Sequence, residues 1–149
     1  MNSKEEHIKY YILGGMKIFP CKSNGKSPLI TGWQNKATSD KEVIDAWWDK
    51  YPDANIGLVT GKKANLVVVY VDGKNGARGM ESLEQLQREC GEFDTRVVHT
   101  PSGGLHYYFS YPQGVDTLKN RGNLMPGIDI RADGGLVIAP GSSIGGKAY

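Results

Sequence analysis

The alternation of hydrophobic and polar positions along the chain predicts three helices. Residues 3–13 open with the spacing of a capping box, Ser3 with Glu6, and are followed by two glycines. Residues 39–51 open on a serine as the expected N-cap, carry apolar side chains at helical spacing and stop before a proline. Residues 79–90 carry a similar apolar stripe and are followed by a glycine.

Runs of apolar, β-branched and aromatic residues predict strands between these helices. They lie at residues 17–20, 56–59, 66–72, 96–100, 105–111, 128–131 and 136–139. Residues 66–72 are almost entirely apolar, which is typical of a central strand covered on both faces. Short glycine-containing turns within residues 96–111 and within residues 128–139 predict two hairpins. The mixed order of elements predicts an α+β fold with a largely antiparallel sheet.

Composition limits the class of protein. The 149 residues fit one domain, residues 1–149, with ordinary apolar and charged content of 39% and 23%. A net charge of +2 allows a nucleic-acid partner without arguing for one. Two isolated cysteines are typical of reduced thiols, and we find neither a signal peptide nor an apolar run of ~18 residues. We therefore expect a cytoplasmic protein with no membrane partner. The chain ends at residues 145–149 in what resembles the middle of a hairpin, so we also expect it to be truncated at its C-terminal end.

Polar side chains recur on single faces of three predicted strands. Side chains alternate between the two faces of a strand, so Tyr70 and Asp72 share a face of the first strand. Asp129 and Arg131 likewise share a face of their strand. On the remaining strand, His106 points to one face and its apolar neighbours point to the other. If the sheet aligns these faces, the polar groups converge.

Such a convergence has chemical value. Asp72 and Asp129 on separate strands can hold Mg²⁺ or Mn²⁺, which take oxygen ligands. His106 and Arg131 can engage the phosphates of a nucleotide. The alternative is structural: Asp72 opens a turn with the glycine after it, Asp129 pairs with Arg131 or a lysine, and His106 lies on the sheet surface.

Several segments, taken in order, resemble a known family. The resemblance rests on the elements Lys26-Ser27-Pro28, Trp33, Trp47-Trp48, Pro52, Asn55-Ile56-Gly57, Thr60-Gly61, VVYVDGKNG at 68–76, TPSGGLHYYF at 100–109 and GIDIRADGGLVIAPGS at 127–142. Together they are similar to the N-terminal domain of bifunctional DNA primase/polymerases, in the archaeo-eukaryotic primase superfamily. That family implies an RRM-like catalytic sheet and template-directed nucleotidyl transfer with divalent metal.

The resemblance implies roles for particular residues. Asp72 and Asp129 fall on acidic positions of the first and third motifs and would be catalytic metal ligands. His106 falls on the second motif and would contact the incoming triphosphate, with Arg131 as our added phosphate contact. Nucleotide binding is also implied for the turn before His106, at Ser102, Gly103 and Gly104.

The implied partners are a DNA template and primer, (d)NTP, and a fused or separate helicase. The setting would be the replication protein of a phage, a plasmid or a mobile element.

One position departs from the family pattern. The first motif should supply two acids one residue apart, but the earlier position is Tyr70. A neutral phenol is a poor ligand for a hard cation, so the loss should weaken metal binding. The chain is then a naturally inactive homologue, or carries a substitution, or uses another acid such as Asp133.

Two further hypotheses about function remain. A catalytically degenerate module would bind nucleotide or DNA without transferring nucleotides. A replication-initiator nicking endonuclease would use a tyrosine nucleophile and two histidines one residue apart. The positions on either side of His106 in that spacing are Gly104 and Tyr108, which does not favour the endonuclease.

Overall fold

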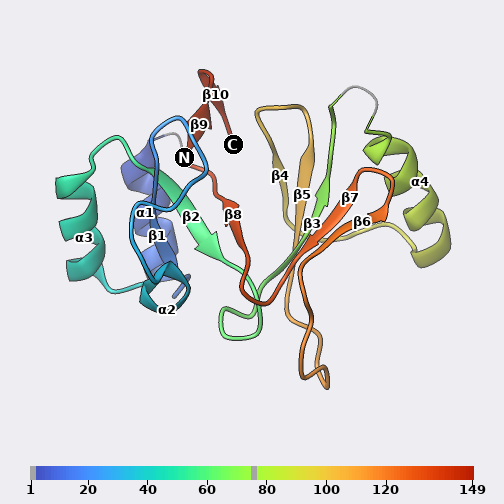
Figure 1. Ribbon diagram of the computed structural model, residues 1–149, viewed down its shortest axis with the longest axis horizontal. Coiled ribbons are helices and arrows are strands. Elements are labelled where there is room, and N and C mark those ends of the chain that lie inside the picture. Colours follow the sequence, from blue (N-terminus) through green and yellow to red (C-terminus); the bar gives the residue numbers. More distant parts are fainter. Residues whose placement is uncertain (1–2, 75–76) are drawn as a thin grey trace. The chain divides into compact units, whose positions relative to one another are not determined.

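The structure, a computed structural model, describes residues 3–74 and 77–149 (Figure 1). Asn75 and Gly76, at the end of the first motif, lie outside the described residues. The chain forms two compact units, Met1–Val59 with Leu136–Tyr149, and Thr60–Gly135. Helices occur with antiparallel sheets, which confirms the predicted α+β class. No helix in the described part of the chain is long and apolar enough to cross a membrane.

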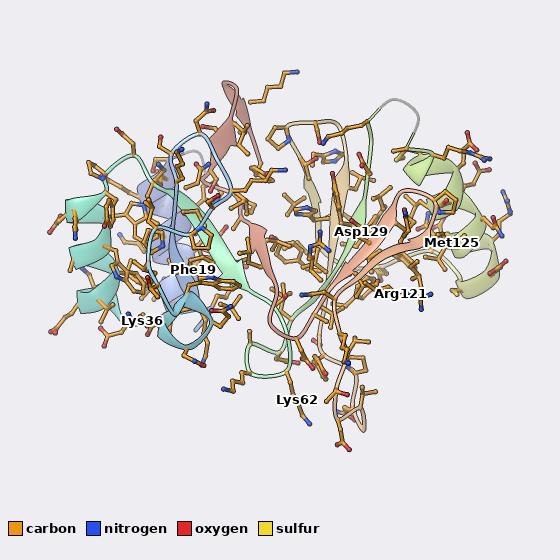
Figure 2. All side chains as sticks on the ribbon, viewed as in Figure 1. Phe19, Lys36, Lys62, Arg121, Met125 and Asp129 are labelled. Carbon is orange, nitrogen blue, oxygen red and sulfur yellow. The ribbon has the colours of Figure 1, made fainter. Side chains whose placement is uncertain are left out.

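The first unit is built on a three-stranded antiparallel sheet in the order β1-β2-β8. Its elements are α1 (Lys4–Leu13), β1 (Ile18–Cys21), α2 (Trp33–Lys36), α3 (Lys41–Lys50), β2 (Asn55–Val59), β8 (Leu136–Ile138), β9 (Ser143–Ile144) and β10 (Lys147–Ala148). Phe19, labelled in Figure 2, is fully buried and stacks on Trp33 with ring centroids 5.0 Å apart. Burial of these apolar side chains is the main force that holds such a sheet.

The N-cap predicted for α1 is confirmed, and the N-cap predicted for α3 is wrong by one residue. The Ser3 side chain accepts a hydrogen bond from the Glu6 N–H at 3.1 Å, as the capping box predicts. Helix α3 is capped by Asp40 and not by the preceding serine, because the Asp40 carboxylate accepts the Glu42 N–H at 2.9 Å. Asp and Ser are both good N-caps, so composition alone did not separate them.

The second unit holds a five-stranded antiparallel sheet in the order β4-β5-β3-β7-β6. Its elements are β3 (Val67–Val71), α4 (Gly79–Cys90), β4 (Val97–His99), β5 (Leu105–Phe109), β6 (Arg121–Met125) and β7 (Ile128–Arg131). Strand β3 is central, as predicted. Val69 and Val71 form a core with Leu83 of α4, so this helix covers one face of the sheet. Tyr70, between these two valines, therefore lies on the opposite face.

The second predicted hairpin is wrong. Strand β7 pairs with β3 and β6, whereas β8 pairs with β2 in the other sheet. The connection between β7 and β8 is bound instead to Thr60, whose hydroxyl donates to the Ala132 carbonyl and whose N–H donates to the Gly135 carbonyl. The chain thus leaves one sheet and enters another across this turn. Strand β6 was not predicted at all.

Asp133, beyond the end of β7, ties together the loops at that end of the sheet. Its Oδ1 accepts the Lys62 N–H at 3.0 Å, and its Oδ2 accepts the Leu118 N–H at 2.9 Å and the Tyr111 hydroxyl at 3.1 Å. The Leu118 N–H is the main cause that holds the pKa of the Asp133 carboxyl below its usual value. The carboxylate form therefore stabilises the folded chain.

Asp133→Asn should lower the melting temperature at neutral pH, because an amide cannot accept hydrogen bonds at both positions. The folded pKa is depressed, so the contribution is complete above the usual Asp range of ~4 and is lost as the pH falls through the folded value. Thermal melts from pH 7 to pH 2.5 should show the difference from wild type shrinking with acidity. Asp116→Asn, on a fully exposed side chain, is the control. A difference that is independent of pH would contradict this account.

Candidate functional site

The register of the central strand brings three predicted site residues into one row. Tyr70 of β3 lies directly opposite His106 of β5 on one side and opposite Asp129 of β7 on the other. Two residues earlier in β3, on the same face, Val68 lies directly opposite Arg131 of β7. All of these residues lie on the face that α4 does not cover. Their convergence, which depended on aligned strands, is therefore present in the second unit.

Asp72 follows the end of β3 and is held there by main-chain contacts. Its N–H donates to the Gly127 carbonyl at 2.8 Å, which joins it to the turn between β6 and β7. Its Oδ1 accepts the Lys74 N–H at 2.9 Å, so it also opens the turn that the structural alternative predicted. One carboxylate oxygen is thus used locally, and the other takes no part in this turn.

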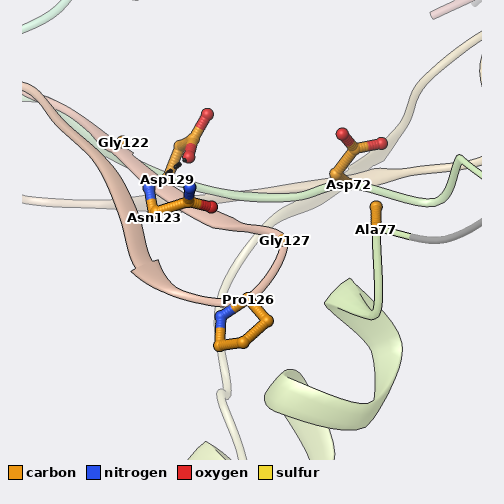
Figure 3. Close-up of a pocket in the computed structure, with 7 residues that line it drawn as sticks. All are labelled: Asp72, Ala77, Gly122, Asn123, Pro126, Gly127 and Asp129. Atoms are coloured by element: carbon orange, nitrogen blue, oxygen red, sulfur yellow. Dashed lines mark hydrogen bonds between the residues drawn. The ribbon is translucent and has the colours of Figure 1, made fainter.

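Asp72 and Asp129 line the same open pocket, which has a volume of about 800 Å³. The lining residues are Asp72, Ala77, Gly122, Asn123, Pro126, Gly127 and Asp129. Figure 3 shows the two carboxylates on opposite sides of it, with Asn123 beside Asp129 and Ala77 beside Asp72. The pocket is therefore acidic, and most of its remaining wall is main chain and small side chains.

Asp129 makes one hydrogen bond and one longer ion pair through its carboxylate. Its Oδ1 accepts the Asn123 N–H at 2.9 Å. Its Oδ2 lies 3.7 Å from Nη2 of Arg131, an ion pair that is longer than a hydrogen bond. The pairing of Asp129 with Arg131 expected under the structural alternative is thus present, and it keeps a cationic group at the site.

Tyr70 occupies the middle of the row. Its ring meets the His106 ring edge-on at a centroid distance of 5.1 Å, and its hydroxyl is hydrogen-bonded to the Ser102 hydroxyl. Burial raises the pKa of the Tyr70 phenol, and the Ser102 hydrogen bond opposes that rise. The negative charges of Asp72 and Asp129 raise this pKa further. Tyr70 therefore stays neutral at physiological pH and adds no charge to the site.

The turn before β5 packs tightly against the end of β3. The Thr100 hydroxyl accepts the Gly104 N–H at 3.0 Å and lies 3.3 Å from the Ser102 hydroxyl. A Cβ on Gly104 would come within 2.5 Å of the Val71 carbonyl oxygen, so only glycine fits there. Gly103 has a φ of +86° and is exposed. Nucleotide binding by Ser102, Gly103 and Gly104 stays a prediction, and the Ser102 hydroxyl already has partners.

The donor set fits a divalent cation that shares its ligands with a substrate. Within residues 3–74 and 77–149, no three His, Cys, Asp or Glu side chains are grouped to hold a metal ion. Asp72 and Asp129 remain, and Mg²⁺ is commonly bound by one or two carboxylates together with substrate phosphates and water. Asp133 does not replace the missing acid, because Lys62, Leu118 and Tyr111 already use both of its oxygens.

Sequence reasoning missed the β6 side of the pocket. Gly122 and Asn123 line it, but the segment before β7 has no apolar alternation and was not interpreted as a strand. All residues of β6 except Met125 are exposed, which explains the weak pattern. A Gly-Asn pair is the sequence signal of a turn or bulge, and it was the only signal available here.

Comparison with models of known protein families matches residues 8–149 to the N-terminal domain of bifunctional DNA primase/polymerases. The match includes the whole of the second unit and thus every residue of the pocket. A search of curated proteins finds no significant match.

Gly79→Ala should destabilise the chain, because a Cβ at Gly79 would lie 2.3 Å from the Asp72 carbonyl oxygen and 2.9 Å from that of Gly127. Overpacking of this kind costs about 1–3 kcal/mol. Helix propensity alone would make the same change stabilising by about 1 kcal/mol, so the sign is diagnostic. Denaturant unfolding measures the difference, with Met80→Ala at the exposed neighbouring position as control. A Gly79→Ala variant as stable as wild type would show that the contact is not tight.

Proposed function

Since the chain belongs to the bifunctional DNA primase/polymerase family, we propose that it transfers nucleotides from (d)NTP to a DNA primer under the direction of a template. The setting we propose is the replication protein of a plasmid, phage or other mobile element. The observation that carries the proposal is the shared pocket of Asp72 and Asp129, in the unit whose sheet also presents Arg131.

The residues of the pocket would act mainly by position and charge. Asp72 and Asp129 would hold Mg²⁺ or Mn²⁺ between them, and such an ion neutralises the charge that develops on the phosphates. The main chain holds both carboxylates before any ligand arrives, since Asp72 Oδ1 accepts the Lys74 N–H and Asp129 Oδ1 accepts the Asn123 N–H. Groups fixed in advance need little reorganisation during the reaction, which is where most of such catalysis comes from.

Arg131 is the cation best placed to receive the triphosphate. It lies on the same face as Asp129, and its guanidinium is 3.7 Å from the Asp129 carboxylate. A guanidinium can bind phosphate oxygens in a bidentate manner. His106 would contact the triphosphate from a nearly buried position, since the residue is 8% exposed and its ring meets the Tyr70 ring edge-on.

A second candidate function is a module that binds nucleotide or DNA without catalysis. It is favoured by one observation, the neutral phenol of Tyr70 between His106 and Asp129. Each lost carboxylate weakens the attraction for a divalent cation, and a two-metal arrangement needs more ligands than Asp72 and Asp129 supply. Binding of nucleotide would survive such a loss better than transfer.

Asp129→Ala should abolish nucleotide incorporation if the chain is an active polymerase. A primed template with dNTP and Mn²⁺ would be extended by wild type, and the variant should be at least about 100-fold slower, since even loss of a supporting group can cost that much. Asp116→Ala changes a fully exposed acid of the same unit and should leave the rate unaltered. Equal extension by Asp129→Ala and wild type would remove this residue from the reaction.

Tyr70→Asp should restore the acid that the family pattern has at this position. We expect extension to rise about 10-fold or more over wild type, because a third carboxylate would join the two in the pocket. The control is Tyr70→Asn, because asparagine has the size of aspartate but no charge. It separates the effect of the added carboxylate from the effect of losing the tyrosine ring. If wild type extends primers well and Tyr70→Asp adds nothing, the non-catalytic candidate is wrong.

A further inference from the structure

Strand β6 departs from regular pairing directly opposite Asp129. Arg121 pairs with Ile130, and Met125 pairs with Ile128. Three residues of β6, at positions 122, 123 and 124, therefore lie opposite the single residue Asp129. Figure 2 labels Arg121, Met125 and Asp129 on these two strands. A bulge of this kind bends the strand and redirects its main-chain groups, and bulges are frequent beside active sites.

The bulge directs one N–H at the carboxylate of Asp129. Asn123 has a φ of +52°, in the left-handed region, and its N–H donates to Asp129 Oδ1 at 2.9 Å. In a regular ladder this strand would donate to main-chain carbonyls of β7. The donor therefore serves a side chain of the pocket, and a short contact with an ionised carboxylate is among the stronger hydrogen bonds in proteins.

We propose that Asn123 is a positioning residue, whose main-chain N–H orients the Asp129 carboxylate for a divalent cation. The inference deepens the proposed function and rests on it. With Oδ1 held by this N–H, the carboxylate cannot rotate freely. Oδ2 remains for a cation, because its contact with Arg131 is 3.7 Å and longer than a hydrogen bond. Partners that orient ligands in this way are worth about 10-fold to 100-fold in metal affinity.

The proposal assigns the effect to the backbone of Asn123 and not to its side chain. Asparagine tolerates the left-handed region better than most residues, and glycine tolerates it at no steric cost. A β-branched residue is strongly disfavoured there and would turn the N–H away from Asp129. Glycine at position 123 should therefore keep the orientation of the carboxylate, and valine should lose it.

The test is a Mn²⁺ titration of the full chain, in which the signal of free Mn²⁺ is followed by electron paramagnetic resonance. We expect Asn123→Gly to bind within about twofold of wild type and Asn123→Val to bind at least about 10-fold more weakly. Leu124→Val, in the same bulge, controls for a β-branched residue at an exposed site. Asn24→Val, at a φ of +53° in the other unit, controls for backbone strain. Both controls should bind as wild type does.

Two results would overturn the proposal. If Asn123→Gly binds as weakly as Asn123→Val, the side chain itself binds the cation. If Asn123→Val binds as wild type does, the N–H has no effect on the site.

Hydrogen exchange distinguishes this failure from failure of the proposed function. The amide of Asn123 should be protected in wild type and should lose its protection in Asp129→Ala, with no metal present. If wild type binds no Mn²⁺, the metal role of the pocket is wrong for both proposals, whether or not the amide is protected. If Mn²⁺ binds but the amide exchanges freely, only the positioning role is wrong.

Discussion

The pairing register of β3 is the constraint on which the site depends. A strand side chain changes face with every residue, so a shift of one position would move Tyr70 to the side that α4 covers. The core of Val69, Val71 and Leu83 fixes that register, because these side chains must stay on the helix side. Packing on one face therefore decides which polar groups meet on the other.

Close main-chain packing then fixes the ends of the strands. Gly79, Gly127 and the backbone of Asp72 approach so closely that no Cβ fits at either glycine. This contact joins the start of α4, the end of β3 and the turn between β6 and β7. As a result the backbone holds Asp72 in the pocket lining, through its N–H on the Gly127 carbonyl and through the Lys74 N–H on its Oδ1.

The tyrosine in the first motif changes what the pocket offers to a ligand. Tyr70 lies between His106 and Asp129 in the sheet. Its side chain is uncharged and forms a hydrogen bond with the Ser102 side chain. The pocket thus keeps two carboxylates where the family pattern has three acids. Substrate phosphates would have to supply more of the ligands to any cation, which couples metal binding to nucleotide binding more closely than in a site with three acids.

Much of this arrangement could be predicted from the sequence, for physical reasons. Apolar runs and turn glycines gave α4, β3 and the β4–β5 hairpin, since burial on a sheet leaves a strong pattern. The same reasoning failed for β6, because an exposed edge strand with a bulge has no alternation to detect. The sequence pattern also predicted a hairpin of β7 with β8, because the turn residues between them are typical of a hairpin. In the structure the two strands pair in different sheets. The contacts of Thr60 that bind this turn are long-range and leave no local signal.

The most direct test of the central claim, that Asp72 and Asp129 form one cation site, is the paramagnetic broadening of amide signals by Mn²⁺. In the ¹⁵N-labelled chain, substoichiometric Mn²⁺ should broaden the amides of the pocket wall, at Asp72, Gly122, Asn123 and Gly127. The amides around Asp133 should be affected much less, because its oxygens are bonded within the chain. Broadening centred elsewhere, or none at millimolar Mn²⁺, would contradict the account.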